Sequence, residues 1–524
     1  MTSLLSKTLL TTTAAAALSV ALGAGPAMAQ SAQAAPAPSD AEIAIDLLEL
    51  LVEEGVVPAD RAQALLDRAR QTAALRVQAA APPTPTTIDV AYVPELVRNQ
   101  IRDEIRTEVM TQARTEGWVA PNTMPEWLNR ISLTGDFRLR FEGNYFDEGN
   151  YPFFPDANAI NEAGGVKTAE GFPLLNSTTN RNRYRYRARL GINAQLSPQV
   201  FMGIVLASGS DDGAVSTNET LGDYFSKDPI WIDKAYLRYQ PMTGVTLTGG
   251  RMPNPFYSTD LVWDTDINPE GVALSIAHDF GVAKVFSTSA YLPLQERELD
   301  DEDRYLAATQ FGAETKVGET ISIKAAVAYY AFANVQSRRN PAQGSRIYDY
   351  TAPAVLARGN SIFNMRTDGT TTLAGLASDF DVLNVTGHVD YTGFDGLRVR
   401  VIGDFAKNLA YDRSQIQLLQ AEASVPSGDI AWQARVDFGT LSTGRRGDWM
   451  VSAGYKYLET DAVLDIFTDS DFGLGGTDLE GFILEGKYGL ADSATLNLKW
   501  LSTDAISRPP FSTDVLQVTL ETEF

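Results

Sequence analysis

The sequence has no cysteine and only two histidines, His278 and His388, among 524 residues. Without cysteine, the chain can form neither a disulfide framework nor a thiolate metal site. With only two histidines, the chain also has little capacity for imidazole chemistry. Long apolar runs are also missing beyond the first residues, since no later segment approaches the roughly 18 to 20 continuous apolar residues of a membrane-spanning helix. The composition therefore argues against a disulfide-stabilised domain and against a helical membrane protein.

The one apolar run of note stands at the start of the chain. Residues 1–29 contain one basic residue, Lys7, then an alanine-rich apolar stretch and a small-x-small site, Ala27-Met28-Ala29. This pattern is typical of a secretory signal peptide that is removed on export. A membrane anchor is the alternative, but the apolar stretch is short for a membrane span. We therefore expect an exported protein whose mature chain begins near Gln30.

Two helical segments are predicted between the signal peptide and residue 130. Residues 30–87 read as a helical hairpin flanked by Ala/Pro-rich linkers, with a capping box at 39–42 (SDAE). Residues 88–130 contain an amphipathic helix whose apolar stripe is narrow. The stripe consists of Val93, Val97, Ile101, Ile105 and Val109. Such a stripe suits the seam of a short coiled coil, but it equally suits a helix packed on the protein's own barrel or hairpin.

From Ile131 onward, polar and apolar residues alternate. The stretch RNRYRYRARLGINAQL, residues 181–196, has an arginine at every second position from Arg181 to Arg189. In an extended strand, alternate side chains point to opposite faces, so one face is charged and the other is apolar. Such a run could follow a nucleic-acid backbone, form a solvated stripe or line an aqueous interior. The formal net charge of −23 argues against nucleic acid.

Sixteen segments with this strand-like character are predicted. They are 131–142, 181–196, 200–208, 230–240, 244–251, 271–277, 283–291, 308–317, 321–331, 383–392, 396–407, 430–439, 448–457, 479–488, 494–502 and 514–524. Seven short links alternate with eight longer ones throughout the series. That asymmetry is typical of an outer-membrane barrel, with short periplasmic turns and long external loops. Residues 131–524 are therefore predicted to form an all-β fold, a transmembrane antiparallel β-barrel of about 16 strands.

Several stretches resemble the putative porin family of proteobacterial outer-membrane proteins. These are 47–57 (LLELLVEEGVV), 93–109 (VPELVRNQIRDEIRTEV), 117–142 (GWVAPNTMPEWLNRISLTGDFRLRFE), 181–191 (RNRYRYRARLG) and 249–274 (GGRMPNPFYSTDLVWDTDINPEGVAL). The resemblance implies a signal peptide, a periplasmic helical segment and a general-diffusion-type pore. It does not imply a particular substrate.

If the apolar faces of the strands meet lipid, the polar faces line the lumen. Ten arginines are then predicted to line the pore: Arg138, Arg140, Arg183, Arg185, Arg187, Arg189, Arg238, Arg398, Arg400 and Arg435. The loop 254–270 could fold inward and set Asp260, Asp264 and Asp266 against them. Opposed charges across a narrow lumen would create a transverse field that orients polar solutes. The alternatives are a loop that caps the external rim, and arginines that only brace the wall through salt bridges.

The chain ends on an aromatic residue, Phe524, at the close of an alternating strand. Such an ending resembles the signal that outer-membrane proteins present to the barrel assembly machinery. We therefore expect a porin in the outer membrane of a Gram-negative bacterium, with its helices in the periplasm. It would be a water-filled channel for passive diffusion of small hydrophilic solutes or ions. Membrane lipid is the other expected partner, and association into a homotrimer is left open. No cofactor, metal or nucleic acid is expected.

Two other functions remain open at this point. A structural barrel that tethers the envelope through its periplasmic helices is the main alternative, and it is compatible with a pore. An outer-membrane hydrolase is the weaker one. Its only hint is His388, next but one to Asp390 on one strand face, whereas a hydrolase of this kind needs a Ser–His–acid set. The expectation is therefore that the protein is not an enzyme.

Overall fold

The computed structural model describes residues 130–209, 214–298, 302–342, 344–421, 425, 428–507 and 509–524. The predicted signal peptide (1–29), helical hairpin (30–87) and amphipathic segment (88–130, apart from its last residue) lie outside the described residues. In the part that is described, no helix combines the length and the apolar character needed to cross a membrane.

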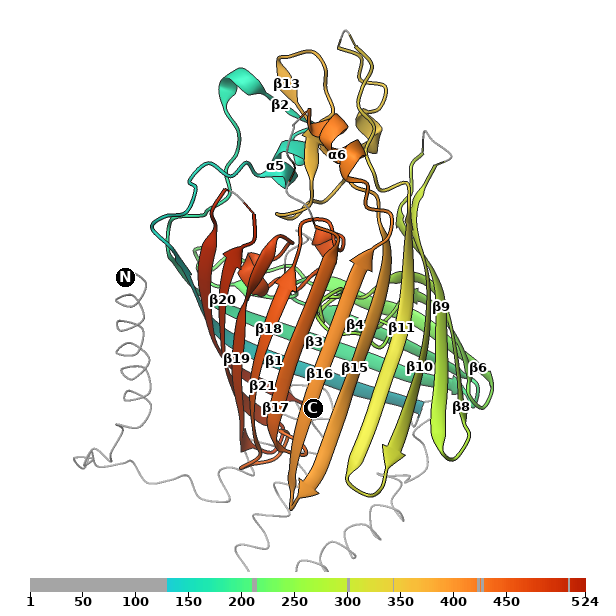
Figure 1. Ribbon diagram of the computed structural model, residues 1–524. Coiled ribbons are helices and arrows are strands. Elements are labelled where there is room, and N and C mark those ends of the chain that lie inside the picture. Colours follow the sequence, from blue (N-terminus) through green and yellow to red (C-terminus); the bar gives the residue numbers. More distant parts are fainter. Residues whose placement is uncertain are drawn as a thin grey trace, which may run out of the picture. The chain divides into compact units, whose positions relative to one another are not determined.

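Sixteen antiparallel strands form a closed barrel (Figure 1). They are β1 (Ile131–Phe146), β3 (Arg181–Ser197), β4 (Val200–Ala207), β6 (Trp231–Met242), β7 (Val245–Arg251), β8 (Glu270–Asp279), β9 (Ala283–Gln295), β10 (Arg304–Val317), β11 (Ile321–Ala333), β15 (Asp381–Phe394), β16 (Leu397–Asn408), β17 (Ile430–Thr440), β18 (Trp449–Leu458), β19 (Leu479–Ala491), β20 (Ala494–Ala505) and β21 (Ser512–Glu523). Each strand pairs with its neighbours along the chain, and β1 pairs with β21 to close the ring. Closure leaves no unpaired edge, as a sheet in lipid requires. The predicted barrel of sixteen strands is confirmed.

Short turns join the strands at one end of the barrel, and long loops join them at the other, upper end in Figure 1. The long loops contain α5 (Ala157–Glu162), α6 (Arg413–Gln420), the short strands β2 (Val166–Lys167), β5 (Glu219–Thr220), β12 (Ile362–Asn364), β13 (Thr371–Thr372) and β14 (Ala374–Leu376), and the 3-10 turns η2 (Thr168–Glu170), η3 (Asp349–Thr351), η4 (Asp465–Phe467) and η5 (Phe472–Leu474). Pairing of β2 with β13 links the loop after β1 to the loop after β11. The long loops thereby form a joined cap at this end of the barrel (Figure 1).

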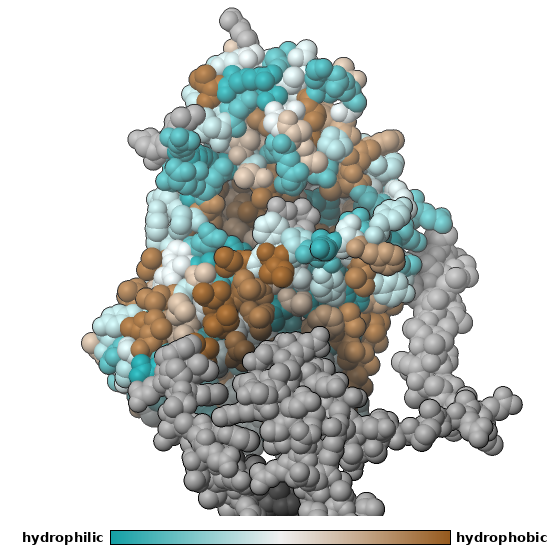
Figure 2. Space-filling model, turned by 180° about the vertical axis from the view of Figure 1, so that it is seen from behind, coloured by the Kyte–Doolittle hydropathy of each residue, from teal (hydrophilic) through white to brown (hydrophobic). Residues whose placement is uncertain are grey.

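The two faces of the barrel wall differ in a way that reverses the usual pattern of a water-soluble protein. Tyr184, from the apolar face of β3, is 64% exposed, whereas Arg187, from its charged face, is 4% exposed. Figure 2 shows large apolar side chains gathered on the wall and mostly polar ones on the cap above it. Because exposed apolar area of this extent is unfavourable in water, the outer face is suited to lipid.

The interior also contains a buried apolar cluster. Phe256 and Trp263, on the loop between β7 and β8, pack their rings 5.3 Å and 5.5 Å from that of Tyr330 on β11. Phe467, in the loop between β18 and β19, lies 5.2 Å from the Trp263 ring. These contacts bury apolar area and hold both loops to the wall. We refer to these segments as the 252–269 loop and the 459–478 loop.

Candidate functional site

All ten predicted arginines lie on one face of the sheet. In the register of β1 and β3, Arg138 stands opposite Arg187 and Arg140 stands opposite Arg185. Followed from strand to strand through the register, this face also holds Arg183, Arg189, Arg238, Arg398, Arg400 and Arg435. It is the face opposite the exposed Tyr184 of β3, and so the inner face of the barrel.

The arginines of β1 and β3 form a compact group that we call the arginine ladder: Arg138, Arg140, Arg183, Arg185, Arg187 and Arg189. On β3, Arg183 and Arg185 both pair with Glu142, Arg185 at 3.2 Å. Arg189 pairs with Asp136 at 2.6 Å. Each of these carboxylates comes from β1, on the adjacent strand. The wall therefore supplies the counter-charges of these three ladder arginines.

Arg187 has the most carboxylate partners in the ladder. Its guanidinium lies 2.8 Å from Asp136 on β1, 2.5 Å from Glu521 on β21 and 3.4 Å from Asp266 on the 252–269 loop. The side chain is only 5% exposed, so the charge depends on these partners for its stabilisation. Arg187 thus joins two strands and one inward loop.

The 252–269 loop crosses the interior of the barrel. Tyr257 donates to or accepts from His388 on β15 at 2.6 Å, Thr259 bonds Asp404 on β16, and Asp260 lies 3.4 Å from Lys456 on β18. At its other end, Asp266 reaches the ladder on β3. The loop starts from β7 and has partners on β3, β15, β16 and β18. It therefore passes through the interior of the barrel, which a loop confined to the rim would not do.

The three predicted loop aspartates have different surroundings. Only Asp266 meets the ladder, at 3.4 Å from Arg187, 3.9 Å from Arg138 and 4.0 Å from Arg189. Asp264 instead accepts hydrogen bonds from the backbone N–H groups of Asp266 and Ser470, each at 2.8 Å. It therefore fastens the two inward loops to each other and does not oppose the ladder.

A second set of carboxylates, on the 459–478 loop, was not among the predicted site residues. Asp471 lies 3.2 Å from Arg140 and 3.5 Å from Lys499, and Asp469 lies 3.1 Å from Lys456. The sequence offers one signal for them, the DSD motif at 469–471, which places two carboxylates at a spacing of two in a long loop. With them, the six ladder arginines face five carboxylates: Asp136, Glu142, Asp266, Asp471 and Glu521.

The arginines on other strands fall into two groups. Arg400 pairs with Asp390 at 2.6 Å, and Arg435 pairs with Asp437 at 2.6 Å. Arg238 differs, because its guanidinium lies 5.3 Å from the Phe201 ring and 5.7 Å from the Tyr236 ring. Among the residues described, neither Arg238 nor Arg398 has a carboxylate within ion-pair distance. These two cations are on the inner face near the short turns, and their charge is not offset by direct pairing.

The hint of hydrolase chemistry at His388 has a different explanation in the structure. The imidazole Nδ1 shares its hydrogen bond with the phenol of Tyr257 at 2.6 Å. Asp390 is held by two hydrogen bonds from Arg400, at 2.6 and 2.7 Å. A catalytic triad needs the acid to orient the histidine, and here each has another partner. His388 instead helps to fix the 252–269 loop.

Phe524 lies at the seam that closes the barrel. Its backbone N–H donates to the carbonyl of Gly135, and the N–H of Gly135 donates back to the carbonyl of Phe524, each at 3.0 Å. A Cβ atom placed on Gly135 would lie 2.4 Å from the Phe524 ring, so the ring occupies the space that this glycine leaves. The terminal residue thus extends the pairing of β1 with β21.

A closed barrel with an apolar outer face and an interior of ionic side chains defines a membrane β-barrel. The chain belongs to the putative porin family, whose family model matches residues 41–524. This membership confirms the resemblance drawn from the sequence and makes the chain an outer-membrane protein of a channel-forming rather than enzymatic family.

Solved structures with a similar chain path include two bacterial porins. OprB of Pseudomonas putida is 10% identical, with a TM-score of 0.43, over 77% of this chain and 97% of that chain. A triple mutant of the Rhodopseudomonas blastica porin is 12% identical, with a TM-score of 0.35, over 75% of this chain and 100% of that chain. A search of curated proteins found no match.

Proposed function

We propose that the barrel forms a water-filled channel for passive diffusion of small hydrophilic solutes or ions, and that the arginines of its inner face line this channel. The observation that carries the proposal is the reversal of the two faces, with apolar side chains outside and arginines inside. Burying so many charges away from water is costly even when they are paired. A hydrated passage beside them lowers that cost and provides the route for solutes.

The narrowest part of the passage would lie where the two inward loops approach the ladder. Asp266 and Asp471 come from different loops and reach ladder arginines on β3 and β1. Cations on the wall and carboxylates on the loops would give a transverse field at that level. Nearer the short turns, Arg238 and Arg398 would leave the wall net positive. We therefore propose a preference for anions.

The remaining partners follow from the same proposal. The outer face would contact membrane lipid, and Phe524 would be part of the signal to the barrel assembly machinery. Both a monomer and a homotrimer are compatible with this proposal. The N-terminal helices would lie in the periplasm, because an even number of strands returns both barrel ends to the side of the short turns.

Conductance through a planar lipid bilayer tests the proposal directly. Purified full-length protein should produce stepwise increases in current, because each inserted barrel would open one aqueous path. A heat-denatured sample of the same preparation serves as the control. A folded barrel that inserts and passes no current would contradict the channel and would favour the envelope tether.

A further inference from the structure

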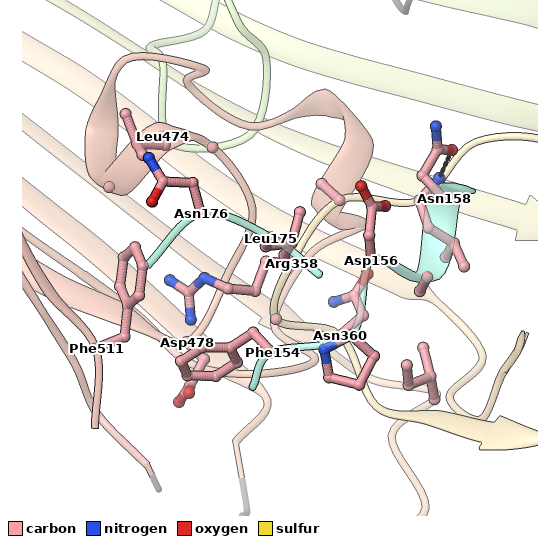
Figure 3. A pocket seen from close by; sticks show the side chains of 18 of the residues that line it. Phe154, Asp156, Asn158, Leu175, Asn176, Arg358, Asn360, Leu474, Asp478 and Phe511 are labelled. Carbon is pink, nitrogen blue, oxygen red and sulfur yellow. Dashed lines mark hydrogen bonds between the residues drawn. The ribbon is translucent and has the colours of Figure 1, made fainter. Parts of the chain in front are cut away.

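A cavity of about 630 Å³ lies at the loop end of the barrel. Its walls come from the ends of β1 and β3, from the loop between them, and from residues 356–362, 473–475, 478, 507, 509 and 511. Figure 3 shows side chains from these separate segments around it, with the rings of Phe154 and Phe511 near Arg358. The cavity thus joins the cap to the rim of the barrel.

Arg358 is the central cation of this cavity. Its guanidinium carbon lies 4.0 Å from the centre of the Phe511 ring and 5.9 Å from that of Phe154. Its Nη2 atom is buried and makes no hydrogen bond among the residues that the structure describes. Burial lowers the pKa of Arg358 to about 10, so the group stays charged at neutral pH. A buried charged donor without an acceptor is unfavourable, and an anionic ligand would supply one.

The two carboxylates that line the cavity already accept hydrogen bonds, and the charge of Asp478 also favours the charged form of Arg358. Asp478 accepts hydrogen bonds from the backbone N–H and hydroxyl of Ser507, at 3.0 and 2.6 Å. Asp156 accepts from the N–H of Ala159 at the start of α5. Arg181 and Arg183 also line the cavity, and Arg183 is already paired with Glu142. Because both carboxylates already accept hydrogen bonds and Arg358 keeps a buried donor without an acceptor, the lining favours an anion over a cation as the ligand.

The apolar part of the wall narrows the ligand class further. Phe154 and Phe511 present ring surface beside the guanidinium. Phe146 and Leu474 also line the cavity. A small inorganic anion could satisfy Arg358 but would leave this surface without a partner. We propose that the cavity binds small organic carboxylates with an aromatic ring, the carboxylate on Arg358 and the ring against the phenylalanines.

This inference rests on the proposed channel, for which it supplies a solute class. Arg183 lines the cavity and also pairs with Glu142 at the loop end of the arginine ladder. A carboxylate released from Arg358 would therefore next meet the ladder cations. The cavity would act as a capture site at the outer mouth of the channel.

Calorimetric titration of the detergent-solubilised full chain tests the site, with benzoate as the probe and benzamide as its uncharged analogue. Wild-type protein should bind benzoate at least about tenfold more tightly than benzamide, as expected for a hydrogen bond between charged groups. Arg358→Gln should weaken benzoate binding by a similar factor. Arg446→Gln, which changes an exposed arginine on a short turn at the opposite end, should leave binding unchanged.

Three results would overturn the proposal. Equal binding of benzamide and benzoate would show that the charge is not recognised. Undiminished binding of benzoate to a folded Arg358→Gln variant would show that Arg358 is not the contact. Inorganic phosphate that competes as well as benzoate does would show that the rings play no part. If the Arg358→Gln variant does not fold, the comparison of benzoate, benzamide and phosphate on wild-type protein still tests whether the cavity recognises an aromatic carboxylate. Calorimetry requires no current, so failure of this site and failure of the channel are distinguishable.

Discussion

At the scale of the residue, two arginines on the same inner face have opposite surroundings. Arg187 lies among the carboxylates of Asp136, Asp266 and Glu521, whereas Arg238 lies between aromatic rings. Removing a buried ion that has several partners costs stability mainly because each partner loses a counter-charge. A cation without a carboxylate partner contributes its full charge to the lumen. The two arginines therefore contribute to different properties, Arg187 to stability and Arg238 to selectivity.

Matched substitutions separate these two roles. Arg187→Met should lower the free energy of unfolding by about 2 to 3 kcal/mol, because it breaks three ion pairs at once. Arg189 still pairs with Asp136 and reaches Asp266, so the loss falls mainly on Glu521. Arg238→Met should change stability by no more than about 1 kcal/mol, the size of a lost cation–π contact. It should instead reduce the preference for anions. Denaturant unfolding measures the first effect, and the reversal potential in a salt gradient measures the second. Equal destabilisation by both substitutions would refute the distinction.

At the scale of the element, the 459–478 loop contains a carboxyl group that is buried among apolar side chains. Asp465 is 2% exposed, and its neighbours Leu464 and Ile466 belong to the apolar cluster or pack against it. Burial raises the pKa of Asp465 to about 8. Because the ordinary value for aspartate is about 3.9, the folded protein binds this proton more tightly than the unfolded chain does. The loop is thus held best with Asp465 protonated.

The pH dependence of stability follows from this shift. A raised pKa contributes stability that is present at acid pH and is lost as the pH rises through about 8. This carboxyl should therefore lower the melting temperature of the wild-type protein as the pH rises from about 4 to about 8, with no further effect above that, and Asp465→Asn should remove its contribution. Asp492→Asn, on an exposed short turn, is the control. The same slope in the wild type and in Asp465→Asn would show that this carboxyl does not titrate in the window.

Strands and inward loops were not equally predictable from the sequence. Alternation located all sixteen strands, but β1 continues to Phe146 and β10 begins at Arg304, beyond the predicted 142 and 308. Backbone hydrogen bonding between the strands continues beyond the segment that faces lipid. There the alternation of polar and apolar residues no longer has to be kept. The path of the 252–269 loop depends on contacts such as that of Trp263 with Tyr330, which leave no periodic trace. Asp266, one of the predicted loop residues, lies 3.4 Å from Arg187 in the structure, whereas Asp469 and Asp471 were not predicted.

At the scale of the whole molecule, the barrel depends on one seam between the first and the last strand. β1 and β21 are paired from Asp136–Glu523 to Phe146–Thr513, and Gly135 and Phe524 add the final pair of hydrogen bonds. The ring of Phe524 covers Gly135 on the outer face. Closure joins segments almost four hundred residues apart, so it is the contact with the largest cost in chain entropy.

A bulkier residue at the seam should therefore impair formation of the barrel. Gly135→Val would place a side chain where the Phe524 ring lies, 2.4 Å from a Cβ atom, so the ring or the strand end must move. Gly403→Val is the matched control, because a Cβ atom there meets nothing within 4 Å. The yield of folded barrel in membranes, measured by heat-modifiable mobility in gel electrophoresis, should fall for the first variant and not for the second. The double variant Gly135→Val, Phe524→Ala should remove the clash. Its seam would still lack the aromatic ring that covers residue 135 in the wild-type protein. If Gly135→Val folds as well as Gly403→Val does, the ring is not needed to close the barrel.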